Sequence, residues 1–352
     1  MKVLIAAGGT GGHVYPALAV AERLRERAHE VVWLGNPDSF ESRAIGAAGL
    51  PFREVRIRGL RGNGLAGWLL APLALWRAIR AALRVLAEER PGVVLGMGGF
   101  VAGPAGIAAW LRRTPLVIHE QNARAGLTNR ALARLARRRL QGFAGALARG
   151  ETVGNPVRAA VAALPPPDER FAGREGPLRI LVLGGSQGAR ALNERMPEAL
   201  ALLPAEQRPQ VRHQGGRSLD LARAAYAKAG VAAELTAFID DMAAAYAWAD
   251  AVVCRAGAST VAELSAAGLG GLLVPFPFAV DDHQTANAAA LVAVGAARCE
   301  QEADLDVQGL ADWLAGLQRP ALQAAATAAR AAARVEATDH IVAVLESEGG
   351  KQ

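Results

Sequence analysis

The pattern that most constrains the fold is an apolar strand followed by a glycine-rich turn and a helix, and it opens each half of the chain. In the first copy, the strand and the turn (GGTGGH) occupy residues 2–13, and the helix is predicted to start near Pro16. In the second copy, the strand and the turn (GGSQG) occupy residues 179–188, and the helix is predicted to start at Ala189. Strands that alternate with helices predict sheets covered by helices. The sequence therefore predicts an α/β protein with two Rossmann-like domains.

Length and composition agree with two domains inside the cell. The 352 residues exceed one ordinary hydrophobic core, and prolines at 165–167 interrupt the chain near its middle. Cys254 and Cys299 lie too far apart to indicate a disulfide framework or a metal site. The apolar stretch at 65–75 is interrupted by a glycine and a proline, and is shorter than the roughly 18 residues of a spanning helix. The N-terminus lacks the features of a signal peptide, so we expect a cytoplasmic protein.

Charge is divided unequally along the chain. Residues 1–156 carry 22 Lys and Arg against 10 Asp and Glu, a net charge of +12. The remaining residues carry 17 against 23, a net charge of −6. This asymmetry predicts that the first half meets an anionic partner, and nucleic acid and an anionic membrane surface are the two candidates.

Aromatic and apolar side chains accompany the arginines of the first half. Trp68 and Trp76 lie in an apolar segment at 65–83 that is interleaved with arginines, and Trp110 is soon followed by Arg112 and Arg113. This mixture is typical of a surface that dips into a lipid interface. The alternative is a helix that packs on the core and exposes its arginines to water.

The stretch from 252 to 287 is the chemical centre of the sequence. A buried strand runs into a small-residue turn at 257–260 and a helix at 261–267, with Gly268 as its stop. Free amides at such a helix start can bind phosphate. Glu263, predicted to be exposed on the first helical turn, can accept hydrogen bonds from a ribose diol. Polar residues at 281–284 follow the next strand, although an ordinary βαβ unit explains the same pattern.

The first half offers a candidate catalytic base. His13 directly follows the glycine turn at 8–12, and the ordinary pKa of histidine lies near neutrality, so this side chain can take a proton. The alternative is a histidine that caps the helix or packs in the core. Further polar groups end a strand at 119–122, and the arginine-rich segment at 130–139 predicts a basic helix.

Eight motifs together resemble one family. They are GGTGGH at 8–13, GMGG at 96–99, HEQN at 119–122, GNPVR at 154–158, GGSQGAR at 184–190, FIDDMAAAYAWAD at 238–250, CRAGASTVAEL at 254–264 and DDHQTANA at 281–288. In this order and over both halves, the chain resembles the MurG family, the peptidoglycan glycosyltransferases of bacteria.

The resemblance implies a GT-B fold, in which two Rossmann-like domains with parallel sheets face each other across a cleft. Residues 1–160 would form the domain that binds the acceptor and the membrane, and 161–335 the domain that binds the UDP-sugar. A C-terminal helix and tail at 336–352 would pack back on the first domain. The family transfers N-acetylglucosamine from UDP-N-acetylglucosamine to the 4-hydroxyl of the MurNAc-pentapeptide of undecaprenyl-linked lipid I. The anomeric carbon is inverted, and lipid II and UDP are released.

The resemblance also implies roles for single residues, from the nucleotide to the acceptor. Glu263 would hold the ribose, and Phe238 with the backbone of Ile239 the uracil. The diphosphate would meet Ala258, Ser259, Thr260 and Ser186, with Arg158 nearby. The sugar would meet His283, Gln284 and Asn122, and the acceptor would meet His13, Thr10, Gly11 and Gly12, with His13 as the catalytic residue.

The chain departs from the family at one position, and the resemblance implies no cofactor or metal. Phe100 stands where relatives often carry a tyrosine, so no role can rest on that hydroxyl. The adjacent pairs Asp240-Asp241 and Asp281-Asp282 are predicted to cap helices rather than to bridge a cation to phosphates. The implied location is peripheral, on the cytoplasmic face of the bacterial inner membrane.

Two other classes of protein explain the sequence less well. A Rossmann dehydrogenase needs the GxGxxG turn and an acidic residue about 20 residues later, and neither glycine turn provides them. A nucleic-acid-binding protein needs aromatic groups that stack on bases, whereas here the tryptophans cluster with leucines. The alternative among enzymes is another GT-B transferase that uses a UDP-sugar and a glycolipid acceptor.

Overall fold

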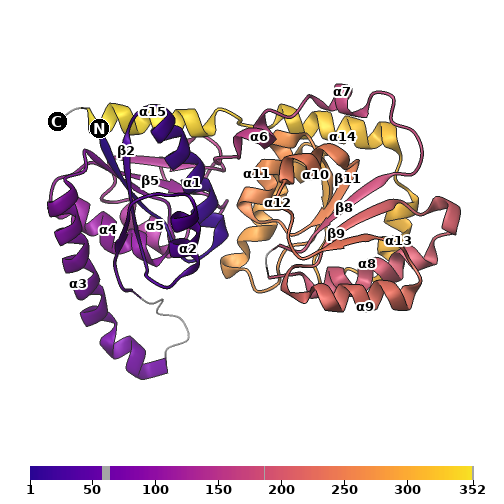
Figure 1. The fold of residues 1–352 in the computed structure, drawn as a ribbon, viewed down its shortest axis with the longest axis horizontal. Coiled ribbons are helices and arrows are strands. Elements are labelled where there is room, and N and C mark those ends of the chain that lie inside the picture. Colours follow the sequence, from indigo (N-terminus) through magenta and orange to yellow (C-terminus); the bar gives the residue numbers. More distant parts are fainter. Residues whose placement is uncertain (58–63, 186, 351–352) are drawn as a thin grey trace. The chain divides into compact units, whose positions relative to one another are not determined.

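The computed structural model describes residues 1–57, 64–185 and 187–350, and of residues 64–70 only the backbone. The chain divides into two compact units. Unit 1 consists of Met1–Val157 together with Val335–Gln352, and unit 2 of Arg158–Arg334. Each unit is a parallel sheet with helices on both sides (Figure 1).

Unit 1 is built on a parallel sheet with the strand order β3-β2-β1-β4-β5-β6-β7. Its strands are β1 (Lys2–Ala6), β2 (Glu30–Gly35), β3 (Phe52–Glu54), β4 (Val93–Gly96), β5 (Leu116–Glu120), β6 (Arg138–Gln141) and β7 (Glu151–Thr152). Its helices are α1 (Gly11–Glu26), α2 (Phe40–Ala47), α3 (Gly64–Glu89), α4 (Gly99–Leu111), α5 (Leu127–Leu132) and α15 (Ala337–Gly349).

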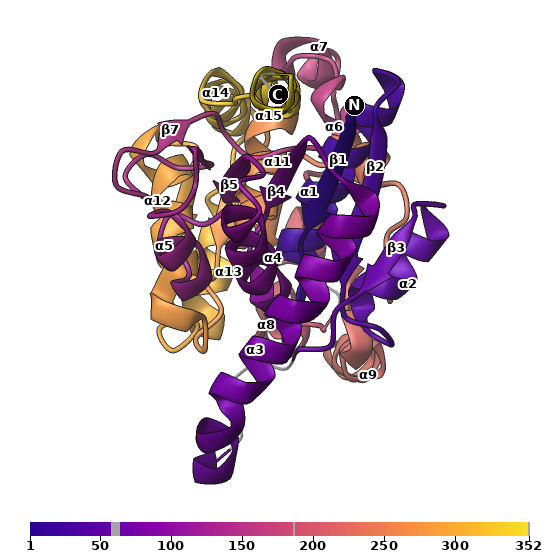
Figure 2. The same ribbon diagram turned by 90° about the vertical axis from the view of Figure 1, so that its left-hand side faces the viewer.

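Alternation along the strands builds two apolar layers in unit 1. Val3 and Ile5 pack in a core with side chains of α1, α2 and α15. Leu4 and Ala6 point to the other face and pack with α3, α4 and α5. Helices α3 and α4 lie side by side on that face (Figure 2). Successive side chains of a strand point to opposite faces, so a buried central strand needs apolar residues at every position. The fully buried run VLIA at residues 3–6 of β1 meets this requirement, and the half-buried Lys2 precedes it.

Helix α15 completes unit 1 from the other end of the sequence. It packs against α1, and Asp339 accepts hydrogen bonds from Arg23 and Arg27, each at 2.7 Å. Glu346 accepts from His29 Nε2 at 2.9 Å. These contacts hold the pKa of both carboxyls below their ordinary values, chiefly through the hydrogen bonds from Arg23 and His29 respectively.

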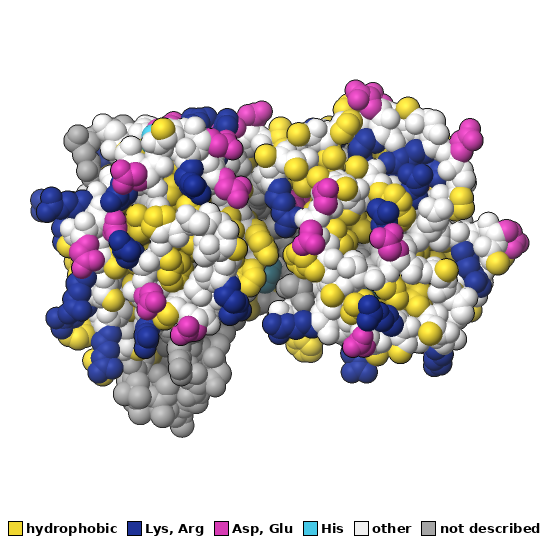
Figure 3. All heavy atoms as spheres, viewed as in Figure 1, with side chains coloured by type: hydrophobic (Ala, Val, Ile, Leu, Met, Phe, Trp, Pro, Cys, Tyr) yellow, Lys and Arg dark blue, Asp and Glu magenta, His cyan; other side chains and the backbone are white. Residues whose placement is uncertain are grey.

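The outer surface of α3 and α4 combines exposed apolar and cationic side chains. Leu73, Trp76 and Trp110 are exposed, and the guanidinium of Arg80 lies 4.7 Å from the centre of the Trp76 ring. Lys and Arg side chains line the left-hand edge of unit 1 in Figure 3, where α3 runs in Figure 1. The opposite side of α3 packs on the core through residues such as Ala78. The helix therefore has both a core face and an exposed face that mixes apolar groups with arginines.

Unit 2 is a parallel sheet with the strand order β10-β9-β8-β11-β12-β13. Its strands are β8 (Arg179–Leu183), β9 (Gln210–Gln214), β10 (Glu234–Thr236), β11 (Ala251–Cys254), β12 (Gly271–Leu273) and β13 (Ala297–Cys299). Its α-helices are α6 (Ala159–Ala162), α7 (Pro167–Phe171), α8 (Arg190–Leu202), α9 (Leu219–Ala229), α10 (Met242–Trp248), α11 (Ala258–Ala267), α12 (His283–Ala293), α13 (Val307–Ala315) and α14 (Arg319–Ala331). Its 3-10 turns are η1 (Ala205–Gln207), η2 (Gly216–Ser218) and η3 (Val280–Asp282).

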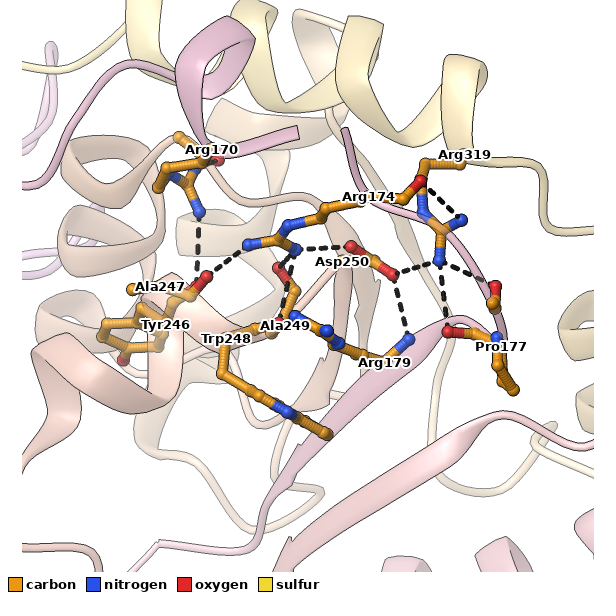
Figure 4. Close-up of polar contacts among 12 residues, drawn as sticks. Arg170, Arg174, Pro177, Arg179, Tyr246, Ala247, Trp248, Ala249, Asp250 and Arg319 are labelled. Carbon is orange, nitrogen blue, oxygen red and sulfur yellow. Dashed lines mark hydrogen bonds and ion pairs between the residues drawn. The ribbon is translucent and has the colours of Figure 1, made fainter. Parts of the chain in front are cut away.

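A buried ion cluster ties the start of unit 2 to its central strand. Asp250 is fully buried just before β11 and accepts from Arg174 Nη1 at 2.5 Å and from Arg319 Nη2 at 3.1 Å (Figure 4). The backbone amide of Arg179 donates to the same carboxylate at 3.0 Å. Arg170 donates to the carbonyls of Ala267 and Gly268 at the end of α11. A buried charge is tolerated only when it is paired and hydrogen-bonded, so this cluster anchors residues 167–179 and α14 to β11.

Several elements differ from the sequence predictions. The predicted basic helix at 130–139 is wrong, because α5 ends at Leu132 and 138–141 form strand β6. The run of arginines suggested a solvated helix, but Leu140 and Gln141 are buried in the sheet. The apolar residues at 52–57 favour a strand over that whole range, but β3 ends at Glu54. The alanine-rich segment from 307 to 346, whose composition favours helix, forms α13, α14 and most of α15.

Candidate active site

Helix α11 presents a free N-terminus directly after strand β11. Gly257 occupies the N-cap and provides no side-chain cap, so the first amides of the helix have no intrahelical acceptor. Ser259 Oγ is buried and has no hydrogen-bond partner within the described part of the chain. Gly268 ends the helix in the left-handed conformation at φ 59°, as predicted. The helix begins at Ala258, three residues earlier than expected, so its free amides belong to the residues of the predicted turn.

The position of Glu263 differs from the prediction. It lies on the second turn of α11 rather than the first, and its side chain is only 13% exposed. Arg158 Nε lies 3.5 Å from Oε1, and Tyr246 Oη donates to Oε2 at 3.0 Å. Burial raises the pKa of Glu263, while Arg158 and Tyr246 act in the opposite direction. The Glu263 carboxylate is therefore a partly buried hydrogen-bond acceptor that Arg158 and Tyr246 keep in place, rather than an unrestrained surface group.

Gln284 organises the loop that follows β12. Its Oε1 accepts from the amide of Ala256 at 3.1 Å and from the amide of Phe276 at 2.9 Å. Both acceptor positions of the amide oxygen are thus occupied by backbone, and the NH2 end is the part that can donate to a ligand. Asn287, fully buried, donates to the carbonyl of Ala256 at 3.2 Å. The polar cluster predicted at 281–284 therefore connects to the β11–α11 turn.

The two aspartate pairs behave differently. Asp241 caps α10, since its side chain accepts from the amide of Ala244 at 2.9 Å, as predicted. Asp282 occupies the N-cap of α12, as predicted, but its side chain accepts from Thr285 Oγ1 at 2.6 Å rather than from a backbone amide. Asp281 and Asp282 adopt positive φ angles of 54° and 49°. Such angles are uncommon for residues other than glycine and mark this loop as strained.

The remaining candidates of unit 2 lie on connecting segments. His283 Nδ1 donates to the carbonyl of Val280 at 2.7 Å, which leaves Nε2 as an acceptor. Phe238 is 50% exposed between β10 and α10, and Ile239 beside it is half-buried. Thr260 is half-buried in the first turn of α11. Ser186 lies outside the described residues.

The glycine turn of unit 1 leads directly into α1. The helix starts at Gly11, so the predicted start near Pro16 is wrong, and Pro16 lies inside the helix. Proline is common in first turns because the first helical amides have no acceptor, and this preference placed the start too late. Thr10 is an exposed N-cap. The buried carboxylate of Glu41 accepts from the amide of Gly9 at 3.3 Å and holds the turn.

His13 contacts two other motifs of unit 1. Its Nδ1 lies 2.9 Å from Gln121 Oε1. A Cβ atom on Gly98 would lie 2.8 Å from His13 Cε1, so glycine at this position leaves room for the ring. The ring is half-buried. The turn at 96–99 and the end of β5 thus meet at His13.

Asn122 is positioned by the buried carboxylate of Glu120. Glu120 Oε1 accepts from the amide of Asn122 at 3.0 Å and from its Nδ2 at 3.2 Å. Oε2 accepts from the amide of Gly126 and from Asn129 Nδ2. His119 and Glu120, predicted as ligand groups at a strand end, lie inside β5 and are buried. They support the site rather than line it.

Comparison with known proteins decides the family. The family model of the glycosyltransferase family 28 N-terminal domain matches residues 3–141. The model of the C-terminal domain of the same family matches residues 179–344. The chain belongs to glycosyltransferase family 28. Together with the full-length relatives and the solved structure described next, this match confirms the family predicted from the sequence motifs.

Full-length relatives of this family 28 chain carry the name UDP-N-acetylglucosamine–N-acetylmuramyl-(pentapeptide) pyrophosphoryl-undecaprenol N-acetylglucosamine transferase. The protein of Alkalilimnicola ehrlichii is 57% identical over 353 residues, covering 99% of each chain. The protein of Bordetella pertussis is 57% identical over 345 residues, covering 98% of this chain and 97% of its own.

Solved structures agree with the family 28 assignment. MurG of Acinetobacter baumannii matches with a TM-score of 0.86 and 38% identity, covering 98% of this chain and 99% of its own. The glycosyltransferase of kitacinnamycin matches with a TM-score of 0.66 at 19% identity, which shows the fold alone. The predicted GT-B fold class is confirmed.

Three groups at the family 28 site were missed from the sequence. Gln121, Tyr246 and Gly98 contact His13 or Glu263, yet none was predicted to do so. Gln121 and Gly98 stand inside motifs that were recognised, and their place in HEQN and GMGG was the available signal. Among the described residues, no cluster of His, Cys, Asp and Glu has the arrangement of a metal site. No helix in the described ranges combines the length and apolarity needed to cross a bilayer.

Proposed function

We propose that this family 28 chain transfers N-acetylglucosamine from UDP-N-acetylglucosamine to the 4-hydroxyl of the MurNAc-pentapeptide of lipid I, releasing lipid II and UDP. The observation that carries the proposal is the identity of 57% over whole chains to relatives named for this transfer. The eight sequence motifs are distributed over both units, so the similarity is not confined to a shared nucleotide-binding fold.

Unit 2 supplies the donor site of the proposal. The free amides at Ala258 and Ser259 and the positive end of the α11 dipole bind the diphosphate, with Arg158 beside them. Glu263, aligned by Tyr246, accepts from the ribose hydroxyls. The exposed ring of Phe238 and the backbone of Ile239 hold the uracil. Gln284 and His283, at the start of α12, contact the sugar.

Unit 1 supplies the acceptor site and the base. Because Gln121 Oε1 is an acceptor, the proton of neutral His13 is on Nδ1, and Nε2 carries a lone pair. His13 Nε2 removes the proton of the 4-hydroxyl as that oxygen attacks the anomeric carbon. Thr10, Gly11 and Gly12 border the acceptor, and Asn122, held by Glu120, contacts the transferred sugar.

The chemical step is an in-line displacement with inversion. The new bond joins the acceptor oxygen to the anomeric carbon, and the bond from that carbon to the UDP oxygen breaks. The electron pair of the broken bond stays on the diphosphate, which the α11 amides and Arg158 stabilise. Preorganised donors of this kind act on the charge that develops in the transition state. The proton of the acceptor ends on His13.

The surface of α3 and α4 supports a peripheral location on an anionic membrane, and the family resemblance implies the cytoplasmic face of the inner membrane. Trp76 and Trp110 enter the lipid interface, while Arg77, Arg80 and Arg84, all exposed, meet anionic headgroups. Trp68, predicted to share this role, lies outside the described side chains. No nucleic-acid partner is proposed.

A transfer assay tests the proposal. The full chain is incubated with UDP-N-acetylglucosamine, UDP-N-acetylgalactosamine, UDP-glucose or UDP-galactose, each with a lipid I analogue or with diacylglycerol. Transfer that requires UDP-N-acetylglucosamine and the lipid I analogue is the expected result. Preference for another UDP-sugar or for diacylglycerol would favour the alternative, a different GT-B glycolipid transferase.

A further inference from the structure

A chain of hydrogen bonds in unit 1 starts at a backbone carbonyl and ends at His13. His119, fully buried in β5, places Nε2 2.8 Å from the carbonyl oxygen of Gly154. A carbonyl oxygen only accepts, so Nε2 of His119 carries the proton. Nδ1 of the same ring is then an acceptor.

The amide of Gln121 can continue this series of hydrogen bonds in only one orientation. Its Nε2 lies 3.1 Å from His119 Nδ1 and 3.2 Å from the His119 carbonyl oxygen. Both partners are acceptors, so the NH2 end of the amide must be on this side and the oxygen must face His13. The backbone oxygen of Gln121 also accepts from Asn155 Nδ2 at 2.9 Å, which restrains the residue.

Because His119 is neutral, the orientation of the Gln121 amide stays the same. Burial lowers the pKa of His119 to about 4, so the ring is neutral at neutral pH. A second proton on Nδ1 would oppose the NH2 group of Gln121. The hydrogen bond to Gly154 and the neighbouring Glu120 act to raise this pKa, but the Glu120 carboxylate is occupied by Asn122, Gly126 and Asn129.

We propose that Gln121, oriented by His119, is a positioning residue that fixes the tautomer of His13 with the proton on Nδ1. The hydrogen bond made by one ring nitrogen of a histidine decides which nitrogen is protonated. With Nδ1–H donated to Gln121, His13 presents the lone pair of Nε2 to the acceptor. Loss of the correct tautomer alone severely impairs the serine protease triad. The inference rests on the proposed role of His13 as the base.

The tautomer can be measured without turnover. The full chain is labelled with ¹⁵N-histidine, and the His13 signal is identified by its loss in His13→Gln. We expect the wild-type spectrum to show Nδ1 protonated and Nε2 unprotonated. Gln121→Leu should shift His13 toward a mixture of tautomers. A wild-type ring protonated on Nε2, or an unchanged spectrum in Gln121→Leu, would overturn the inference.

Kinetics with UDP-N-acetylglucosamine and a lipid I analogue give the second readout. Gln121→Leu should lower kcat about 10- to 100-fold, the loss seen when the hydrogen-bond partner of a metal-bound histidine is removed, and leave the donor KM nearly unchanged. The matched control is Gln141→Leu: Gln141 is also a buried glutamine at a strand end, bonded to Gly150, Thr152 and Leu147 but not to His13. An equal loss of kcat in both variants would reduce Gln121 to a structural role.

A conservative variant covers the case in which Gln121→Leu fails to fold. Gln121→Glu keeps an acceptor for Nδ1–H, so the tautomer should be retained. The second carboxyl oxygen faces the two acceptors of His119, so it must carry a proton to replace the NH2 donor of Gln121. We expect the ¹⁵N spectrum of Gln121→Glu to keep Nδ1 of His13 protonated, and a ring protonated on Nε2 would contradict the contact. If the tautomer shifts in Gln121→Leu but turnover does not fall, His13 is not the base, whereas absence of transfer by the wild type would reject the proposed function itself.

Discussion

One histidine is buried in the sheet of each unit. The two rings lie in similar surroundings, but their hydrogen bonds lead to different parts of the molecule. His119 in β5 and His213 in β9 are both fully buried, and burial lowers the pKa of each to about 4. His213 bonds to Tyr226 Oη at 3.1 Å and to Asn193 Oδ1 at 2.9 Å, both of them buried. The chain from His119 instead leads through Gln121 to the half-buried His13. A lowered pKa therefore does not mark a site by itself, and what the buried group touches decides its role.

The largest effect is expected at His13, the half-buried end of the hydrogen-bond chain in unit 1. His13→Ala should lower turnover by about 10²–10⁴, the usual contribution of a general base, and leave UDP affinity nearly unchanged. His13→Asn should be similarly impaired, because an amide cannot take the proton. The measurement is steady-state kinetics with a soluble lipid I analogue across pH.

The control for this variant lies in the other unit. His213→Gln should alter stability while largely sparing kcat, since its contacts stay inside α8, α9 and β9. A His13→Ala enzyme with more than about a tenth of wild-type turnover would be too active for the loss of a general base. His13 would then only orient the acceptor.

The two buried histidines should both make the free energy of unfolding depend on pH in the acidic range. Between pH 6.5 and about 4 the unfolded chain binds a proton at each histidine that the folded chain does not. The free energy of unfolding therefore rises with pH across this window, and each histidine accounts for about 3 kcal/mol that is lost as pH falls through it. Urea unfolding of the full chain at pH 4.5 and 7 measures the loss.

Single replacements apportion the acid effect between the units. His119→Gln and His213→Gln should each flatten the pH dependence by about the share of one histidine. Stability that depends on pH as steeply in the variants as in the wild type would show that other groups carry the effect.

Unit 2 also contains a mostly buried side chain, Glu263, that is proposed to contact a ligand, whereas His213 contacts only buried side chains. Glu263→Ala should weaken UDP binding by about 1.5–3 kcal/mol, the range for hydrogen bonds to a charged group. Because the side chain is mostly buried and bonded to Tyr246, some stability should also be lost. Calorimetric titration with UDP measures the affinity.

Glu263→Gln separates the two effects. The amide oxygen can still accept from Tyr246 and from one ribose hydroxyl, so the fold should survive and UDP binding should weaken less than in Glu263→Ala. Unchanged affinity in Glu263→Ala would remove this residue from the nucleotide site.

The smallest effect concerns the surfaces of the two units. Arg80→Ser with Arg84→Ser on α3 should weaken binding to anionic vesicles by about 1 kcal/mol for each arginine, and wild-type binding should fall with salt. The matched control replaces Arg190 and Arg223, which are exposed on unit 2. Equal flotation losses in the two double variants would remove the α3 surface from the membrane interface.

Short-range patterns of the sequence determined the architecture of this protein. Alternating strands and helices predicted two Rossmann-like folds, and Gly268 ended α11 where expected. The failures were also local. The arginines of 130–139 resembled a solvated helix, but Leu140 and Gln141 pair with neighbouring strands in a sheet whose register no local pattern reveals. Pro16 suggested a first turn that begins five residues earlier, at Gly11.

The candidate site was predicted one residue at a time, and tertiary structure decided how those residues are held. His13 and Glu263 stood out because their residue types follow glycine turns after strands. Gln121, 108 residues from His13, meets it only because β1 and β5, with β4 between them, end at the same edge of one parallel sheet. Tyr246 reaches Glu263 only because α10 packs on α11. Such contacts depend on the three-dimensional placement of distant segments, so the exposure and tautomer of a site residue follow from packing rather than from spacing along the chain.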